Sequence, residues 1–265
     1  MTSPDMPMPA LLSASDSPCV DALVPSPNFG PRQAKVDMLV LHYTGMASGE
    51  AAIDLLRTPS SEVSCHYVVR EDGSVVQMVA EAARAWHAGR SSWEGVTDIN
   101  SRSIGIEIVN GGHDFGLPDF PAAQIAAVIA LCADIVARHA IRADRVLAHS
   151  DVAPARKRDP GENFPWDTLH AAGIGHLVAP SRVEGGRFFM LGDAGEPVAA
   201  LKAMLALYGY GIEPTEAYDA ATAEVVAAFQ RHFRPARVDG VADAATILTL
   251  RDLIATRPGD APKVA

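Results

Sequence analysis

The sequence predicts an α/β domain with a mixed central β-sheet flanked by helices, followed by a small all-α domain of three helices. Short apolar runs typical of buried strands alternate with segments of helical periodicity over residues 36–178. Beyond residue 189 only helical patterns recur. At 265 residues, 48% of them hydrophobic, the chain is long enough to fold as two unequal domains.

These patterns divide the chain into four parts. They are an N-terminal arm at 1–35, an α/β domain at 36–178, a linker at 179–189 and a three-helix domain at 190–265. The arm is rich in Pro and Ser and has no periodicity, so we expect an extended segment rather than a core element. The linker lies in the Gly-containing stretch "AAGIGHLVAPSRVEGGR".

The first half of the α/β domain contains most of the expected strands. "VDMLVLHYTG" is a short apolar run that predicts a buried strand ending at His42, and "EAAIDLLR" predicts a short helix after it. "SCHYVVREDGSVVQMV" is two β-rich runs separated by residues 71–73, which favours a hairpin. "SIGIEIVN" alternates, so its isoleucines share one face of a strand and Glu107 lies on the other.

Helical patterns dominate the rest of the chain. "PAAQIAAVIALCADIVARHA" begins with Pro121 at a helix start and has apolar residues at helical spacing, and "DRVLAHS" predicts another strand ending at His149. Two of the three C-terminal helical patterns begin with "DAAT". We interpret Asp219 and Asp243 there as N-caps rather than as signs of a deeper repeat.

Composition excludes several classes of partner and site. The net charge is −10 and the pI about 5.3, without a stripe of Lys or Arg, which argues against a nucleic-acid partner. Cys19, Cys65 and Cys132 are odd in number and widely spaced, so neither a disulfide framework nor a thiolate metal site is indicated.

The N-terminus has no signal-peptide pattern, and no stretch approaches the roughly 18 uncharged apolar residues of a transmembrane helix. We expect a cytosolic protein, with a periplasmic one as the alternative.

The loop "AHSDVAPARKRDPGENFPW" carries the most suggestive chemistry. His42 and His149 lie at predicted strand ends, where side chains converge over one edge of a sheet. Asp159 follows His149 by ten residues and precedes a proline that favours extended backbone. In an extended segment Lys157 and Asp159 point the same way and Arg158 points the other way.

This set of residues suits a hydrolytic zinc site. Two neutral imidazoles and one carboxylate leave a fourth zinc position for water, which could ionise near neutral pH. Glu107 suits the role of proton acceptor, and Lys157 suits an oxyanion that develops on an amide carbonyl. Spacing alone leaves other interpretations open, because histidines at strand ends are often structural and a Lys near an Asp is often a solvated pair.

Five motifs in sequence order resemble one known family. "LHYTG", "SCHYVV", "AWHAG", "SIGIEIVN" and "AHSDVAPARKRDPG" look like the zinc-dependent N-acetylmuramoyl-L-alanine amidases of the type-2 family, over residues 25–166. The resemblance implies the type-2 amidase fold, shared with peptidoglycan recognition proteins. It implies one Zn²⁺ per chain on His42, His149 and Asp159, with Glu107 and Lys157 as the catalytic pair. It also implies cleavage of the amide between the lactyl group of a muramic acid and the L-alanine of its stem peptide.

Other residues transfer from this resemblance less directly. We expect four of them to line a sugar or peptide groove: Tyr43, Trp86, His87 and Asn100. We expect His66 and His87 not to bind the metal but to support its ligands from behind, to be structural or to line the substrate groove. The other histidines match no motif and are expected to be ordinary surface or core residues: His113, His139, His170, His176 and His232.

The C-terminal part resembles the small three-helix peptidoglycan-binding domain that often accompanies wall hydrolases. The short motifs most characteristic of that domain are "AFQ" at 228–230 and "DG" at 239–240. The alternative is that this bundle only shapes or stabilises the amidase. The resulting hypotheses are a cytosolic recycling amidase acting on soluble muropeptides, an exported amidase acting on polymeric wall, and a non-catalytic peptidoglycan sensor. Binding-only members tend to lose zinc ligands, whereas all three positions are filled here.

Overall fold

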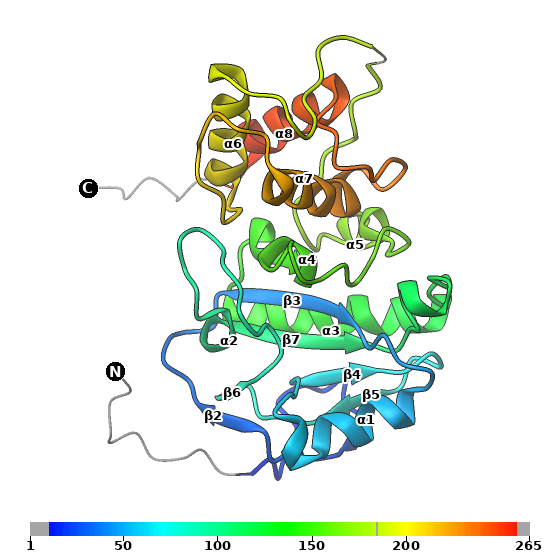
Figure 1. The fold of residues 1–265 in the computed structure, drawn as a ribbon. Coiled ribbons are helices and arrows are strands. Elements are labelled where there is room, and N and C mark those ends of the chain that lie inside the picture. Colours follow the sequence, from blue (N-terminus) through cyan, green and yellow to red (C-terminus); the bar gives the residue numbers. More distant parts are fainter. Residues whose placement is uncertain (1–10, 184, 259–265) are drawn as a thin grey trace, which may run out of the picture.

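The computed structural model describes residues 11–183 and 185–258, and Figure 1 shows an α/β layer with a group of helices stacked on one side of it. The main sheet has six strands in the order β1-β5-β4-β7-β3-β8. Their bounds are β1 Ala22–Leu23, β3 Met38–Tyr43, β4 Tyr67–Val69, β5 Val75–Gln77, β7 Ser103–Ile108 and β8 Val146–Ala148. β3 is parallel to β7 and β8, whereas β4 and β5 are antiparallel to each other. The expected mixed sheet and hairpin are therefore confirmed.

The register of the two central strands positions the site. β3 and β7 pair so that His42 lies opposite Glu107, and paired residues of neighbouring parallel strands face the same side of a sheet. The alternate residues, which include Leu41 and Ile106, are buried in a core on the other face. The alternation expected of "SIGIEIVN" is therefore confirmed.

Helices cover both faces of the sheet (Figure 1). Those of the α/β part are α1 Gly49–Arg57, α2 Ile99–Arg102, α3 Ala122–His139, α4 His149–Val152 and α5 Trp166–Ala171, with short 3-10 turns at 59–61, 113–115 and 143–145. Apolar side chains of α3 pack with the isoleucines of β7, whereas those of α1 pack with Val68 and Val76 on the opposite face. The predicted helices at 50–57 and 121–140 are thus confirmed to within a residue or two.

α3 also bears on the expectation about membrane spans. Among the described residues it is the one helix that is long and apolar enough to cross a membrane, with 18 residues and a mean hydropathy of 1.5. The core of a folded protein demands the same composition. Val128, Leu131 and Ile135 are fully buried against the sheet, so α3 is accounted for as a core helix.

Two predictions for the α/β part were wrong in detail. Residues 22–31 of the predicted arm are not outside the fold: β1 pairs with β5, and β2 (Phe29–Pro31) pairs with β6 (Ala83–Ala85) in a second sheet. Strands of two and three residues are too short to show an alternating pattern. His149 does not end a strand but begins α4, since β8 stops at Ala148. Residues 1–10 of the arm lie outside the described residues.

The C-terminal part forms the expected three helices, α6 Glu196–Tyr208, α7 Ala220–Phe233 and α8 Ala244–Thr256. Asp219 and Asp243 cap α7 and α8, because their side chains accept hydrogen bonds from the backbone N–H groups of Thr222 and Thr246. The N-cap interpretation is confirmed. Residues 259–265, at the end of the predicted domain, lie outside the described residues.

A single apolar core joins the two parts. It includes Val40, Trp93 and Val152 from the α/β part together with Tyr210 and Phe229 from the helical part. Trp93 is fully buried, and its ring lies edge-on to that of Tyr210 with centroids 5.0 Å apart. The helical part therefore packs directly on the α/β part.

Candidate metal centre

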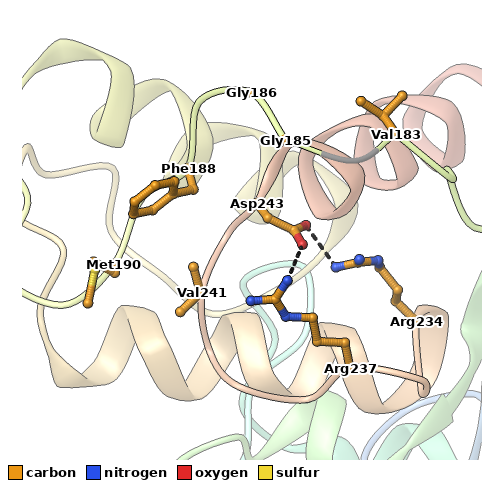
Figure 2. A pocket seen from close by; sticks show the side chains of 9 residues that line it. All are labelled: Val183, Gly185, Gly186, Phe188, Met190, Arg234, Arg237, Val241 and Asp243. Atoms are coloured by element: carbon orange, nitrogen blue, oxygen red, sulfur yellow. Dashed lines mark hydrogen bonds and ion pairs between the residues drawn. The ribbon is translucent and has the colours of Figure 1, made fainter.

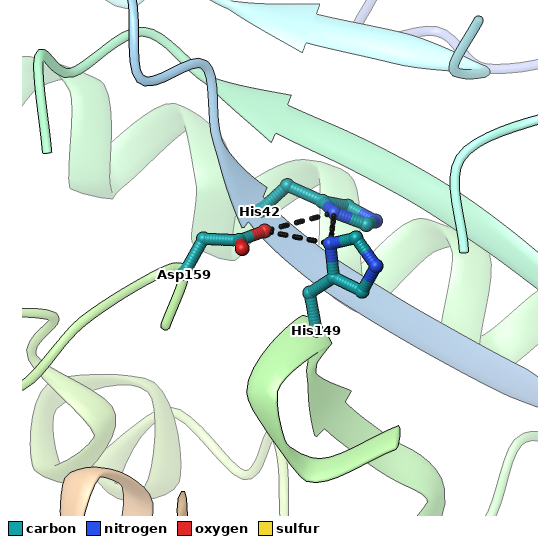
Figure 3. A group of neighbouring side chains, drawn as sticks. All are labelled: His42, His149 and Asp159. Carbon is teal, nitrogen blue, oxygen red and sulfur yellow. Dashed lines mark hydrogen bonds and ion pairs between the residues drawn. The ribbon is translucent and has the colours of Figure 1, made fainter. Parts of the chain in front are cut away.

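Two histidines and an aspartate meet where β3 and β8 end (Figure 3). The Nδ1 atoms of His42 and His149 are 2.8 Å apart, and Asp159 Oδ2 lies 3.1 Å from the first and 2.9 Å from the second. All three side chains are buried, and together they could hold a metal ion. The three predicted ligands, separated by up to 117 residues in sequence, are thus brought to one point.

A hydrogen bond between His149 and a backbone carbonyl indicates which of its two ring nitrogens is free to bind a metal. Its Nε2 lies 3.2 Å from the carbonyl oxygen of Ala88, which can only accept a hydrogen bond. In the neutral ring that donates from Nε2 to this carbonyl, Nδ1 presents a lone pair toward His42 and Asp159. Metal-binding histidines are commonly oriented in this way by an acceptor behind the ring.

A longer chain of hydrogen bonds indicates that Nδ1 is also the free ring nitrogen of His42. The hydroxyl of Ser103 donates to the carbonyl of Ile99 at 2.7 Å, so it accepts from His87 Nε2 at 3.0 Å. Burial lowers the pKa of His87 well below its usual value, and a neutral ring has only one N–H. His87 Nδ1 must then accept from His42 Nε2, 3.0 Å away. The Nδ1 of His42 is left with its lone pair facing the cluster.

The charge states of the cluster also suit a cation. Burial, and then the neighbouring His149, lower the pKa of His42 to about 4, so its ring is neutral at pH 7. Asp159 adds an oxygen, Oδ2, that lies 3.1 and 2.9 Å from the Nδ1 atoms of His42 and His149. The three possible ligand atoms lie 2.8–3.1 Å from one another, close enough to bind one metal ion together.

Glu107 lies beside this cluster with an unsatisfied oxygen. Its Oε2 is buried and has no hydrogen-bond partner among the described residues. Burial, and then the charge of Asp159, raise the pKa of Glu107 well above its usual value, although Lys157 acts in the opposite direction. A carboxylate whose pKa is raised in this way is a stronger proton acceptor than an ordinary one.

A cavity of about 410 Å³ opens onto these groups. Glu107 and Lys157 line it together with His149 and Asp159. Three of the four predicted substrate contacts also line it, namely Tyr43, Trp86 and His87. Arg158, which the sequence placed on the opposite side from Lys157, lines the cavity as well and lies 3.5 Å from Asp114.

Asn100 has a different position from the one expected. It is not among the residues that line the cavity. Its Oδ1 accepts hydrogen bonds from the backbone N–H groups of His87 and Ala88, at 3.0 and 2.8 Å. Asn100 therefore holds the segment that carries the hydrogen-bond partners of His42 and His149.

Sequence reasoning missed several residues that support the site. Ser103 stands at the end of the chain that orients His42, and no motif distinguishes it from other serines. His113 was expected to be ordinary, yet its Nδ1 lies 3.0 Å from the hydroxyl of Tyr43 and its Nε2 3.0 Å from Glu162. The Nδ1 of His66 accepts a hydrogen bond from the backbone N–H of Gly105 on β7.

A second, larger cavity of about 620 Å³ lies in the C-terminal part (Figure 2). Its walls combine exposed apolar side chains, Phe188 and Met190, with Asp243 and two arginines. Arg234 and Arg237 lie 2.7 and 3.5 Å from the carboxylate of Asp243. Among the described residues that line it there is no histidine, so size does not identify the catalytic cavity here.

Comparison with known proteins agrees with this geometry. Residues 32–162 match the N-acetylmuramoyl-L-alanine amidase family, and residues 194–250 match the peptidoglycan binding domain family. The chain is 40% identical over 227 residues to the N-acetylmuramoyl-L-alanine amidase AmiD of Escherichia coli, covering 80% of each protein. It is 35% identical over 167 residues to the 1,6-anhydro-N-acetylmuramyl-L-alanine amidase AmpD of Enterobacter cloacae, covering 56% of this chain and 87% of that relative.

Solved structures give the same result. The E. coli AmiD complex with anhydro-N-acetylmuramic acid-L-Ala-D-gamma-Glu-L-Lys superimposes with a TM-score of 0.71 at 36% identity, over 84% of this chain and 91% of the other. AmpDh3 of Pseudomonas aeruginosa with an anhydromuramic pentapeptide gives 0.67 at 32% identity, over 82% and 91%. The type-2 amidase fold expected from the five motifs is confirmed. The chain therefore belongs to the N-acetylmuramoyl-L-alanine amidase family and carries a peptidoglycan-binding domain after its amidase domain.

Proposed function

We propose that this amidase depends on zinc and hydrolyses the amide between the lactyl group of an anhydromuramic acid and the L-alanine of its stem peptide. One observation carries the zinc assignment: hydrogen bonds leave His42 and His149 with Nδ1 lone pairs that face Asp159 Oδ2 at one buried point. Two imidazole nitrogens and one carboxylate oxygen form a ligand set typical of catalytic zinc, with a fourth position open.

The reaction follows from the residues around that point. Zinc, when bound, supplies a Lewis acid that polarises the amide carbonyl and favours ionisation of water. Glu107 Oε2, which has no hydrogen-bond partner in the described part of the chain, accepts the proton of the attacking water and passes it to the departing amino group as the C–N bond breaks. The ammonium group of Lys157, which lines the same cavity, stabilises the oxyanion that develops on the carbonyl.

The relatives support the choice of substrate. The AmiD and AmpDh3 structures contain anhydromuramic peptides, and the name of AmpD specifies a 1,6-anhydro-N-acetylmuramyl substrate. A cavity of about 410 Å³ falls within the usual range for small-molecule sites. We propose that Tyr43, Trp86 and His87 contact the sugar or the first residues of the peptide, because they line this cavity beside the metal ligands.

We propose peptidoglycan recycling as the biological role, with soluble muropeptides as substrates in the cytosol. A second candidate, hydrolysis of polymeric wall in the periplasm, is favoured by the match of residues 194–250 to the peptidoglycan binding domain. Both roles share the same chemistry at His42, His149 and Asp159. They differ in the size of the substrate that reaches the cavity.

One experiment tests the chemistry and separates the two roles. The purified protein, with chelator and after zinc is restored, is given a soluble anhydromuropeptide and intact sacculi in parallel, and released stem peptide is followed by mass spectrometry. Zinc-dependent release from the soluble substrate alone supports recycling. Comparable release from sacculi would assign the enzyme to the wall, and release that chelator does not reduce would refute the zinc assignment.

A further inference from the structure

The helical C-terminal part makes two side-chain hydrogen bonds to Asp151 of the amidase part, two residues after the proposed ligand His149. The carboxylate of Asp151 is completely buried. Its Oδ1 accepts from the hydroxyl of Tyr210 at 2.7 Å, and its Oδ2 accepts from Nδ1 of His232 at 2.7 Å. Tyr210 follows α6 and His232 lies in α7, so both partners come from the C-terminal part.

Asp151 is in turn tied to the metal ligands. Its Oδ2 also accepts from the backbone N–H of Ala148 at 2.8 Å, which caps the start of α4, the helix that begins with His149. The next residue, Ser150, donates its backbone N–H to the carbonyl of Asp159 at 3.0 Å. Any displacement of α4 would therefore move one ligand and the backbone of another.

The donors to Asp151 have little freedom to move. Tyr210 is 2% exposed and His232 is 3% exposed. The His232 ring is stacked between Trp166, with centroids 3.7 Å apart, and Phe233, with centroids 3.9 Å apart. Without these two donors, the buried carboxylate would keep only the Ala148 N–H among the partners named above, at a high cost in free energy. Tyr210 and His232 therefore help to fix where Asp151 sits.

We infer that Tyr210 and His232 are positioning residues for the metal centre, and that the C-terminal part holds α4 in the conformation that binds the metal. This inference rests on the proposed function, in which that metal is zinc. It gives the C-terminal part a role in the amidase reaction that is independent of any contact with the cell wall. The role is exerted through Asp151 and α4, without contact with the substrate.

A pair of tyrosine variants tests the inference in the full-length protein. Tyr210→Phe removes the donor to Asp151, whereas Tyr218→Phe removes a matched buried hydroxyl that donates to the carbonyl of Gly240 at 2.7 Å within the C-terminal part. Zinc affinity is measured by chelator competition, the geometry of the site by the absorption spectrum of the cobalt-substituted protein, and folding by thermal unfolding. We expect Tyr210→Phe to weaken zinc binding about tenfold and to alter the cobalt spectrum. Tyr218→Phe should lower the unfolding temperature but leave both metal readouts as in the wild type.

Two histidine variants provide an independent comparison. His232→Phe keeps a ring between Trp166 and Phe233 but removes the donor, and His232→Asn keeps a donor at the position of Nδ1 but loses the stacking. We expect His232→Phe to bind zinc more weakly than His232→Asn even where His232→Asn is the less stable protein. The reverse order of zinc affinity would overturn the inference.

The outcomes also separate this inference from the proposed function. Wild-type zinc affinity and cobalt spectrum in Tyr210→Phe would overturn the positioning role alone, since the wild-type enzyme would still bind zinc and release stem peptide. A wild-type protein that bound no zinc would overturn the proposed function and this inference together.

Discussion

His87→Ala should weaken zinc binding even though His87 is not proposed as a ligand. In the wild-type protein His87 Nδ1 accepts a hydrogen bond from the N–H at His42 Nε2. On the other side of the His87 ring, Nε2 donates a hydrogen bond to the hydroxyl of Ser103. Without His87, the N–H of His42 loses its acceptor. The His42 ring can then rotate or change tautomer, and Nδ1 no longer faces Asp159 as its favoured state.

The size of this effect follows from the geometry. Removing an outer hydrogen-bond partner of a ligating histidine typically costs 10- to 100-fold in metal affinity, or about 1.4–2.7 kcal/mol. We expect the upper half of that range. The His87 ring also packs on Gly105, where an added Cβ would lie only 2.5 Å from the ring, so its loss opens a space beside β7.

Chelator competition and calorimetric titration measure the zinc affinity of His87→Ala directly. The matched control is His176→Ala, because His176 is also buried and makes two side-chain hydrogen bonds, to Tyr208 and Thr256, in the C-terminal part. The control should lose stability but retain wild-type zinc affinity. Equal zinc affinity in His87→Ala and the wild type would refute the tautomer argument for His42.

Four further predictions concern the cluster and its surroundings. His149→Ala should abolish both zinc content and cleavage, measured by metal analysis and peptide release; retained turnover would exclude it as a ligand. Lys157→Ala should keep zinc and lose roughly 100- to 1000-fold in kcat, and near-normal turnover would remove its oxyanion role. Glu107→Gln should likewise keep zinc and slow turnover, whereas unchanged activity would make Glu107 structural. The fourth concerns pH: burial, and then the charge of Arg32, lower the pKa of His66 to about 3. As the pH falls through about 6.5, His66 therefore becomes protonated in the unfolded chain but stays neutral in the folded chain. The stability that neutral His66 contributes to the folded state is present above that pH and is lost as pH falls toward 3. Between pH 7 and 5 the wild type should lose about 2 kcal/mol more unfolding free energy than His66→Gln in denaturant titrations, and parallel losses would contradict the assignment.

The residues proposed to carry the chemistry could be predicted because they lie in locally distinctive segments that resemble motifs of the amidase family. His42 ends a short apolar run, Glu107 alternates with three isoleucines, and Lys157 and Asp159 share a loop bounded by prolines. Strand pairing then determines which of these residues meet. The register that sets His42 opposite Glu107 is a long-range contact, and period-2 alternation alone cannot specify it.

The sequence by itself determined the classes of element, the three-helix C-terminal part and the absence of a basic stripe. These features follow from periodicity, capping and composition, which are local properties. The tertiary structure alone decided which ring nitrogens of His42 and His149 face Asp159. It decided as well that Asn100 supports a backbone segment instead of lining the cavity, and that residues 22–31 pair into two sheets. It also decided that His232, without any motif around it, donates to Asp151 beside the ligand His149. Each of these depends on hydrogen bonds between groups distant in sequence, whose partners are chosen only when the core closes and buried polar atoms must be satisfied.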